Sequence, residues 1–281
     1  MNSELWGEDR YPALTAELRG DCTRCAGLCC TALWFSKSDG FPADKPSGVP
    51  CRHLRADWLC AIHDQLEERG CRGCRAYDCL GAGQRAAALC SGLRENGEPE
   101  GRAQLCAVFL TLVRLRQTLW YLVCAASLRP AGALLPGLER LIAEEQRLEA
   151  MLPQPLPDGA EEQWRKNADR TLRRAISLTQ QQVLRGRPAR RVRDGAGRRL
   201  RGSLTGADFG MGLLIAADLS GCVLTGANFL GADLRDADLR GADLSESIFL
   251  TQSQINAARG DGATRLPPRL KRPEWWCEKT R

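Results

Sequence analysis

Large apolar residues recur at every fifth position in the last third of the chain. Residues 202–251 divide without gaps into ten units of five residues. The third position of every unit is Leu or Phe, at Leu204, Phe209, Leu214, Leu219, Leu224, Phe229, Leu234, Leu239, Leu244 and Phe249. A period of five matches neither a helix, at about 3.6 residues per turn, nor a strand, at about two. It suits a square coil with one unit on each side, in which the large residues of successive coils stack into one core.

A helical period governs the middle of the chain. Between residues 104 and 128, apolar residues recur three or four positions apart, at Leu105, Phe109, Leu112, Leu115, Leu119, Leu122 and Ala126. This spacing predicts an amphipathic helix that ends before Pro130. The sequence also predicts a helix over residues 137–152 and a third that starts at the N-cap Asp158. We therefore expect an α-helical middle region over residues 91–184.

One apolar run, residues 107–128, has the length of a membrane-spanning helix. It contains Arg114 and Arg116, and a charged side chain near the bilayer midplane costs about 2.5–3.5 kcal/mol. We therefore expect no membrane span. Residues 1–6 lack the basic and apolar stretches of a secretory signal, so we expect a cytoplasmic protein.

Cysteine is concentrated in the first third of the chain. Nine of the fourteen cysteines, and both histidines, lie between Cys22 and Cys79. Such density indicates a disulfide scaffold, a zinc site or an iron–sulfur site. A reducing cytoplasm keeps thiols reduced, which favours metal ligands. A segment of about 60 residues with few apolar runs also needs a cross-link, either a disulfide or a bound metal, to fold stably. We therefore expect a small metal-stapled module, irregular and helical, over residues 1–90.

A basic segment follows the helical region. Residues 185–202 hold eight Arg and one Asp, within a chain whose net charge is +6. Such a run can contact nucleic-acid phosphates. No aromatic residue is interleaved to stack on bases, and Gly and Pro are frequent. We interpret residues 185–201 as an Arg-rich linker and do not expect nucleic acid as a partner.

Residues 202–251 resemble the pentapeptide-repeat family, whose units follow the pattern Ala-(Asp/Asn)-Leu-x-x. Six of the ten units open with Ala-Asp or Ala-Asn. The resemblance implies that residues 202–281 form a right-handed quadrilateral β-helix, a solenoid of about two and a half coils, closed by a C-terminal tail.

Some members of that family protect DNA gyrase by imitating duplex DNA. At about 4.8 Å per coil, two and a half coils rise only about 12 Å. One turn of DNA is about 34 Å long. We therefore rank a gyrase- or nucleic-acid-directed role below a short, rigid docking module for another protein.

The cysteine segment resembles a bacterial cysteine-cluster family described as zinc- or iron-chelating. Its elements are Cys-x-x-Cys, an adjacent Cys-Cys pair, Pro-Cys-x-x-Leu, Cys-x-Ile-(Tyr/His) and Cys-Arg-x-Tyr-x-Cys. The resemblance implies metal ligands at the eight matching thiols, Cys22, Cys25, Cys29, Cys30, Cys51, Cys60, Cys74 and Cys79. Two departures are an extra residue before the Cys-Cys pair and an extra cysteine, Cys71.

The sequence does not distinguish between zinc and iron as the bound metal. Eight thiolates could hold two tetrahedral zinc ions, or an iron–sulfur cluster could take four of them. The adjacent pair, Cys29 and Cys30, could bridge two metals or serve two sites. His53 and His63 could also bind, although thiolates already suffice and we favour surface roles for both.

The sequence thus predicts a cytoplasmic bacterial metal-binding protein with a pentapeptide-repeat docking module. A partner protein would bind through the solenoid or the helical region, and the oligomeric state is open. The first alternative is a metal-dependent redox or modifying enzyme, for which no catalytic residue stands out. The second is the gyrase- or nucleic-acid-directed protein.

Overall fold

The structure is a computed structural model that describes residues 4–91, 99–201 and 203–276. The predicted segments 1–90, 91–184 and 202–281 therefore include residues 1–3, 92–98, 202 and 277–281, which lie outside the described residues. The chain divides into two compact units. The first comprises Met1–Arg10, Tyr121–Arg140 and Ala168–Arg281, and the second Tyr11–Trp120 and Leu141–Asn167.

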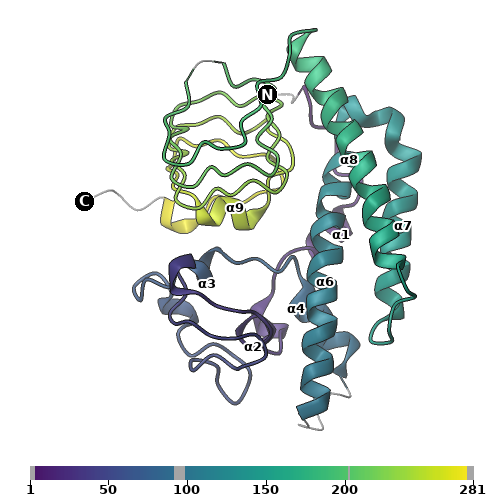
Figure 1. The fold of residues 1–281 in the computed structure, drawn as a ribbon, viewed down its shortest axis with the longest axis vertical. Coiled ribbons are helices and arrows are strands. Elements are labelled where there is room, and N and C mark those ends of the chain that lie inside the picture. The colour runs from purple at the N-terminus through teal and green to yellow at the C-terminus, as the bar shows by residue number, and fades with distance from the viewer. Residues whose placement is uncertain (1–3, 92–98, 202, 277–281) are drawn as a thin grey trace. The chain divides into compact units, whose positions relative to one another are not determined.

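Three long helices make up most of the regular structure. They are α6 (Pro99–Ala126), α7 (Leu135–Met151) and α8 (Ala160–Leu184), close to the helices predicted from the periodicity (Figure 1). Each contributes residues to both units. Among the described residues, one segment, Glu100–Ala126, is long and apolar enough to cross a membrane, and 56% of its apolar window is buried. A core helix of a soluble protein has the same properties.

Polar contacts join the three helices within the second unit. The guanidinium of Arg116 on α6 donates to Glu149 on α7, with Nη2 3.1 Å from Oε1. Arg114 on α6 pairs with Glu161 on α8. Trp164 on α8 is fully buried and donates from Nε1 to the Leu141 carbonyl at 2.9 Å. These contacts explain why both Arg residues can lie on an otherwise apolar helix.

The rest of the second unit consists of short elements. In chain order they are α1 (Pro12–Glu17), η1 (Cys22–Arg24), α2 (Leu28–Ala32), η2 (Lys37–Asp39), η3 (His63–Gln65), α3 (Arg72–Ala76) and α4 (Ala82–Leu89). One core includes residues of α2, α4 and α6, such as Leu28, Ala86 and Phe109. The cysteine-rich segment is thus irregular and helical, with a small apolar core.

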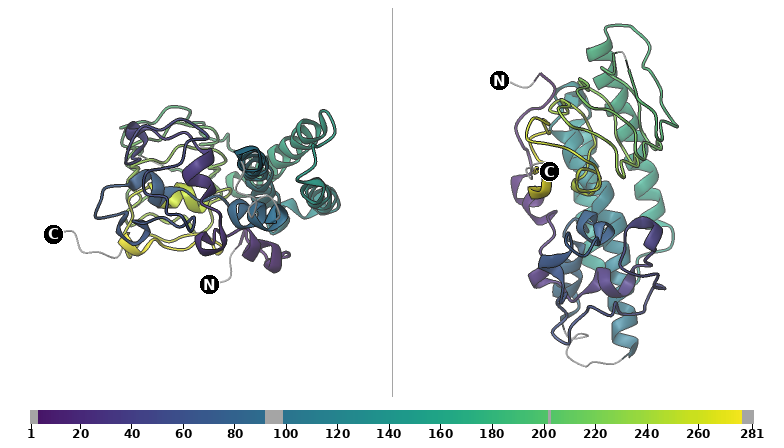
Figure 2. Two further views of the ribbon diagram at one scale, coloured as in Figure 1. Left: turned by 90° about the horizontal axis from the view of Figure 1, so that it is seen from below. Right: turned by 90° about the vertical axis from the view of Figure 1, so that its left-hand side faces the viewer.

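The predicted right-handed quadrilateral β-helix is wrong. No described residue belongs to a β-strand, and the regular secondary structure is helical. Instead, the described residues between 190 and 265 form a stack of coils joined by isolated parallel bridges, such as Asp208 with Asn228 and Asp218 with Asp238. The physical reason is the short period, because each unit of five turns before a ladder longer than one bridge can form. We call residues 190–265 the coil stack; Figure 2 shows it from a second direction.

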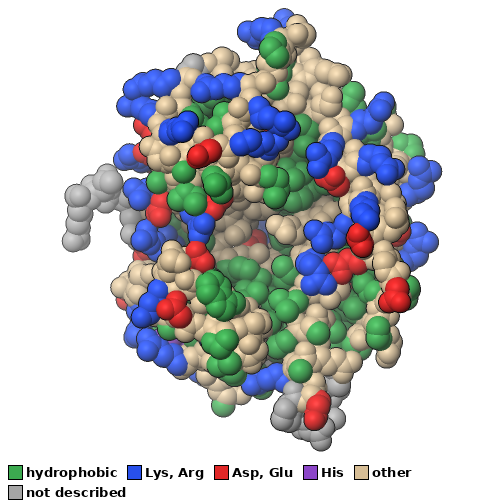
Figure 3. All heavy atoms as spheres, in the orientation of Figure 1, with side chains coloured by type: hydrophobic (Ala, Val, Ile, Leu, Met, Phe, Trp, Pro, Cys, Tyr) green, Lys and Arg blue, Asp and Glu red, His purple; other side chains and the backbone are tan. Residues whose placement is uncertain are grey.

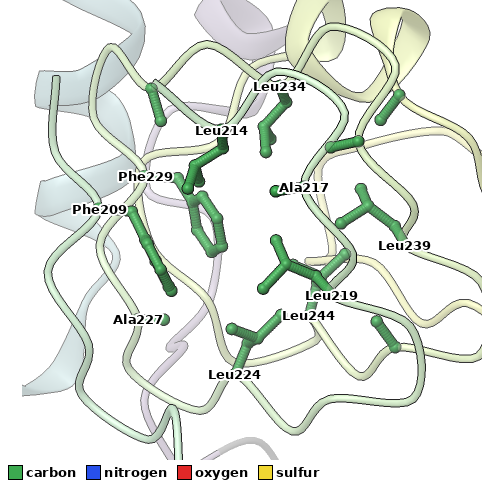
Figure 4. Close-up of a cluster of buried hydrophobic side chains, with 14 of the residues drawn as sticks. Phe209, Leu214, Ala217, Leu219, Leu224, Ala227, Phe229, Leu234, Leu239 and Leu244 are labelled. Atoms are coloured by element: carbon green, nitrogen blue, oxygen red, sulfur yellow. The ribbon is translucent and has the colours of Figure 1, made fainter. Parts of the chain in front are cut away.

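The apolar ladder predicted by the sequence fills the interior of the coil stack. All ten Leu and Phe side chains at third positions are at most 1% exposed, and Figure 4 shows many of them pointing inward. The rings of Phe209 and Phe229, one coil apart, stack with centroids 4.9 Å from each other. Within the stack, helix α9 (Gln252–Ala257) comes after Phe249, the last residue of the ladder, and begins with a capping box between Thr251 and Gln254.

The segment interpreted as an Arg-rich linker is hydrogen-bonded into the coil stack. Arg191, Asp194 and Arg199 form parallel bridges with Asp208, Leu213 and Asp218. Leu200 is 7% exposed and joins the same core as the ladder. This first coil lacks the five-residue pattern because its bridges span 17 to 19 residues instead of 20, so the periodicity does not reveal it.

Candidate functional site

The eight predicted ligands lie on short elements of the second unit. Cys22 begins η1, and Cys25 follows it directly. Cys29 and Cys30 lie on α2, with Sγ atoms 4.0 Å apart. Cys51 and Cys60 flank a turn closed by the Leu54–Cys60 bridge. Cys74 lies on α3, and Cys79 precedes α4. We call residues 22–79 the thiol module; its cysteines are all free thiols.

We call Cys22, Cys25, Cys29 and Cys79 the first thiol group, because charges within the set would raise the pKa of Cys22, Cys29 and Cys79. Partial burial raises the pKa of Cys22 to about 11, and the charges of Cys79, Cys25 and Cys30 add to this. Burial also raises the pKa of Cys25, while hydrogen bonds from the backbone N–H groups of Leu28 and Gly27 oppose the rise. Such N–H donors stabilise a thiolate, the form that binds metal.

Glycine makes room for this group. A Cβ placed on Gly83 of α4 would lie 2.6 Å from the Cys25 Sγ and 3.7 Å from the Cys79 Sγ. Only a residue without a side chain therefore lets both sulfurs approach the helix. Sequence reasoning missed this position, because the sequence does not show which side chains approach a glycine within a helix.

We call Cys30, Cys51, Cys60, Cys71 and Cys74 the second thiol group, because charges on the other four would raise the pKa of Cys74. Burial, followed by the charges of Cys30, Cys71, Cys51 and Cys60, raises the pKa of Cys74 to about 12. The backbone N–H of Cys51 donates to the Cys30 carbonyl at 2.9 Å. Cys71, the cysteine that the family pattern leaves unmatched, is 2% exposed and belongs here. Its spacing alone gave no reason to include it.

The side chains do not surround a metal ion in the described arrangement. Across residues 4–91, 99–201 and 203–276, no three His, Cys, Asp or Glu side chains gather closely enough to hold one. The chemistry of the donors nevertheless suits a soft cation, since the module brings thiols together with N–H groups directed at sulfur. Metal binding therefore stays a prediction.

Tyr77 is a further residue that the sequence did not single out. Its hydroxyl is buried and has no hydrogen-bond partner among the described residues. Burial strongly raises its pKa, and the charges of Cys79, Cys29 and Cys25 contribute. The ring packs on the same apolar core as those three cysteines. An unpaired hydroxyl beside three thiols is a donor available to a thiolate.

The two histidines are engaged at the surface. Arg52 donates from Nε to the His53 Nε2 at 3.2 Å. His63 is largely exposed, and its Nδ1 lies 3.4 Å from the Asp64 Oδ1. Burial followed by the charge of Arg52 lowers the pKa of His53.

Lys45 is the one buried lysine of the thiol module, at 7% exposure. Its Nζ donates to the carbonyl oxygens of Thr31, Leu33, Pro46 and Val49, at 3.2, 2.6, 3.0 and 2.7 Å. Burial lowers its pKa, while the negative charges of Cys51 and Cys30 oppose that shift.

The acidic residues of the coil stack have local partners. Second-position Asp side chains accept from the N–H two residues on, as Asp218 does from Ser220 at 3.0 Å, which fixes each turn. Arg side chains then pair with Asp at Arg191–Asp208, Arg193–Asp208, Arg199–Asp218, Arg235–Asp233, Arg240–Asp238, Arg259–Asp236 and Arg265–Asp243. The surface of the stack therefore mixes both charges instead of presenting a run of acids (Figure 3).

Comparison with known proteins gives the family. The model of the pentapeptide repeats (8 copies) matches residues 214–249. The uncharacterized protein YybG of Bacillus subtilis (strain 168) is 39% identical over 265 residues, which cover 92% of this chain and 95% of that protein. The chain belongs to the YybG family. The match covers 92% of the chain, so the likeness extends well beyond the repeats.

A solved structure also matches part of the chain. It is a pentapeptide-repeat protein, Rfr23, from the cyanobacterium Cyanothece 51142. The sequence identity is 29% and the TM-score 0.20 over 26% of this chain. The chain spans about half of that protein, 53% of its length.

Proposed function

We propose that the thiol module binds zinc or iron through Cys22, Cys25, Cys29, Cys30, Cys51, Cys60, Cys74 and Cys79, and that the coil stack docks a partner protein. The observation that supports the proposal is the presence of nine thiols on four separate stretches of chain within one compact unit, where charges on some of them would raise the pKa of others.

Metal binding would change the protonation of the thiols. Burial raises the pKa of Cys25, Cys60, Cys74 and Cys79, so each is a neutral thiol without a cation. A bound metal displaces the proton and supplies the opposing charge, which couples binding to folding of this small core. The vicinal pair on α2 suits two sites, with Cys29 in the first thiol group and Cys30 in the second.

The coil stack supplies the docking role. Its core is rigidly packed and its acidic residues are held by turns and Arg pairs, so it offers a fixed mixed-charge surface. The row Arg199, Asp218, Asp238 and Arg259 spans three intervals between coils, or about 14 Å at about 4.8 Å each. That remains well short of one DNA turn of about 34 Å. A protein partner therefore fits better than imitation of DNA.

The described cysteines are all free thiols, a state that the reducing cytoplasm maintains. We accordingly propose a cytoplasmic location for the metal-binding protein.

Cobalt titration tests the proposal. Co²⁺ bound by thiolates gives intense charge-transfer absorption, so anaerobic reduced protein titrated with Co²⁺ should develop these bands. The Cys30→Ala variant should lose much of the absorption. Cys90→Ala is the matched control, because Cys90 is buried in the same apolar core as Cys25, Cys29 and Cys79 but belongs to neither thiol group. Wild-type protein without charge-transfer bands, or equal spectra for both variants, would overturn the proposal.

A further inference from the structure

The ammonium of Lys45 lies within a cage of main-chain oxygens. All four carbonyl contacts fall between 2.6 and 3.2 Å, the range of strong N–H···O hydrogen bonds. The Nζ also lies 4.7 Å from the centre of the Phe35 ring. No carboxylate among these contacts balances the charge, so the carbonyl dipoles and the ring face stabilise it.

The four carbonyls belong to two stretches of chain. Thr31 lies in the last turn of α2 and Leu33 is its C-cap, where the last carbonyls of a helix have no intrahelical partner and attract a cation. Pro46 and Val49 lie in the loop that leads to Cys51. The ammonium therefore joins the carboxyl end of α2 to this loop.

Both stretches carry cysteines of the second thiol group. Cys30 immediately precedes Thr31, and Cys51 comes two residues after Val49. Backbone hydrogen bonds run beside the ammonium, from Gly48 N–H to the Thr31 carbonyl and from Cys51 N–H to the Cys30 carbonyl, each at 2.9 Å. The antiparallel bridge between Phe35 and Lys45 holds the base of the loop.

We propose that Lys45 is a positioning residue, whose caged ammonium holds Cys30 and Cys51 together as one half of a metal-binding thiol group. The inference rests on the proposed metal binding for its functional consequence, but its structural consequence is separate. A lysine suits the role because its three protons can be shared among four carbonyls on a flexible stem. Arginine does not suit it, because the N–H donors of a guanidinium all lie in one plane, whereas the four carbonyl oxygens surround a single point.

Two measurements on the full-length reduced protein test this assignment. The first is amide hydrogen exchange of metal-free protein at Cys51, whose N–H is bonded to Cys30. The second is Co²⁺ affinity measured from the charge-transfer bands. Both are compared among wild type, Lys45→Met and Lys37→Met. Lys37 is the matched control, an exposed lysine of the same module.

In Lys45→Met we expect exchange at Cys51 to accelerate by about tenfold or more while exchange in the coil stack is unchanged. We expect Co²⁺ affinity to fall by about 10–100-fold, as for other residues that orient metal ligands. Lys37→Met should match wild type in both. Unchanged Cys51 exchange in Lys45→Met would overturn the proposal, even if the affinity falls.

Chemical rescue separates loss of the ammonium from general damage. Lys45→Ala leaves the four carbonyls and a space for a small cation. Ammonium or methylammonium chloride should restore protection at Cys51, whereas tetramethylammonium chloride, which has no N–H donor, should not. Equal effects of the three salts would contradict the role of the ammonium. Wild-type protein that binds no Co²⁺ while the exchange results hold would refute the proposed function and leave the positioning of Cys30 and Cys51 intact.

Discussion

Arg199 and Asp218 meet twice, through a parallel backbone bridge and through an ion pair with Nε 3.0 Å from Oδ2. Arg199 belongs to the segment that we interpreted as a linker from its charge pattern, and Asp218 belongs to the repeats. The basic run is thus the first coil of the stack, and it neutralises acids of the next.

The pairing predicts weak DNA binding. Duplex and single-stranded DNA should bind only at low salt, with an affinity that falls by a log–log slope of about −0.9 for each phosphate neutralised. Fluorescence anisotropy at physiological salt measures this, with a gyrase supercoiling assay beside it. Submicromolar affinity at that salt, or protection of gyrase from a cleavage-stabilising drug, would instead favour the gyrase-directed alternative.

Adjacent residues of the coil stack should differ sharply in their effect on stability. Leu224 is completely buried, and Val223 is 57% exposed. Leu224→Ala should lower the free energy of unfolding by about 2–5 kcal/mol, and Val223→Ala by less than about 0.5 kcal/mol. Urea denaturation of the two variants measures the difference. Similar losses would mean that the ladder is not the core.

The absence of a side chain at Gly83 should be required for metal binding by the first thiol group. Gly→Ala within a helix usually stabilises by about 0.5–1 kcal/mol, but the new Cβ at position 83 would displace the Cys25 sulfur. Gly83→Ala should therefore reduce Co²⁺ affinity by about 10–100-fold. Gly137→Ala on α7 is the control, because nothing lies within 4 Å of its added Cβ. Equal affinities for the two variants would exclude Cys25 from the site.

A buried carboxyl group should make stability depend on pH. Glu145 is 1% exposed, and its Oε1 has no hydrogen-bond partner among the described residues. Burial, then the charge of Glu149, raises its pKa to about 8 from 4.5. A raised folded-state pKa contributes stability below about pH 4.5 that is lost as the pH rises to about 8.

Replacing the carboxyl with an amide removes this titration. The free energy of unfolding of Glu145→Gln should therefore decline less steeply than that of wild type between about pH 5 and pH 8, by a few kcal/mol over the interval. Glu139→Gln, exposed on the same helix, should follow the wild-type curve. Parallel curves for Glu145→Gln and wild type would show that the carboxyl is not perturbed.

The sequence reveals features that follow a local rule. Periodicity predicts the ladder of ten Leu and Phe residues and the long helices α6, α7 and α8, because in each of them buried positions recur at a fixed spacing. The predicted β-helix was wrong, because a period of five specifies stacked turns but does not specify β-strands. The first coil also escaped notice, since Arg191 to Arg199 bond to the stack through irregular spacings.

Features of the thiol module that depend on distant residues were not accessible to sequence reasoning. Cys71 looked superfluous because the family pattern leaves it unmatched, and its spacing does not show that it is buried. Lys45 gave no signal, since one lysine in a loop resembles any surface lysine until the carbonyls around it are known. Gly83 and Tyr77 likewise acquire meaning only from the sulfur atoms beside them.

The metal content of protein purified without air tests the central claim most directly. Elemental analysis, expressed per protein and accompanied by a visible spectrum, distinguishes colourless zinc protein from brown iron–sulfur protein. The account predicts at least one equivalent of zinc or iron, removed by a chelator together with a lower melting temperature for the thiol module. Fully folded protein with less than half an equivalent of any transition metal would contradict it.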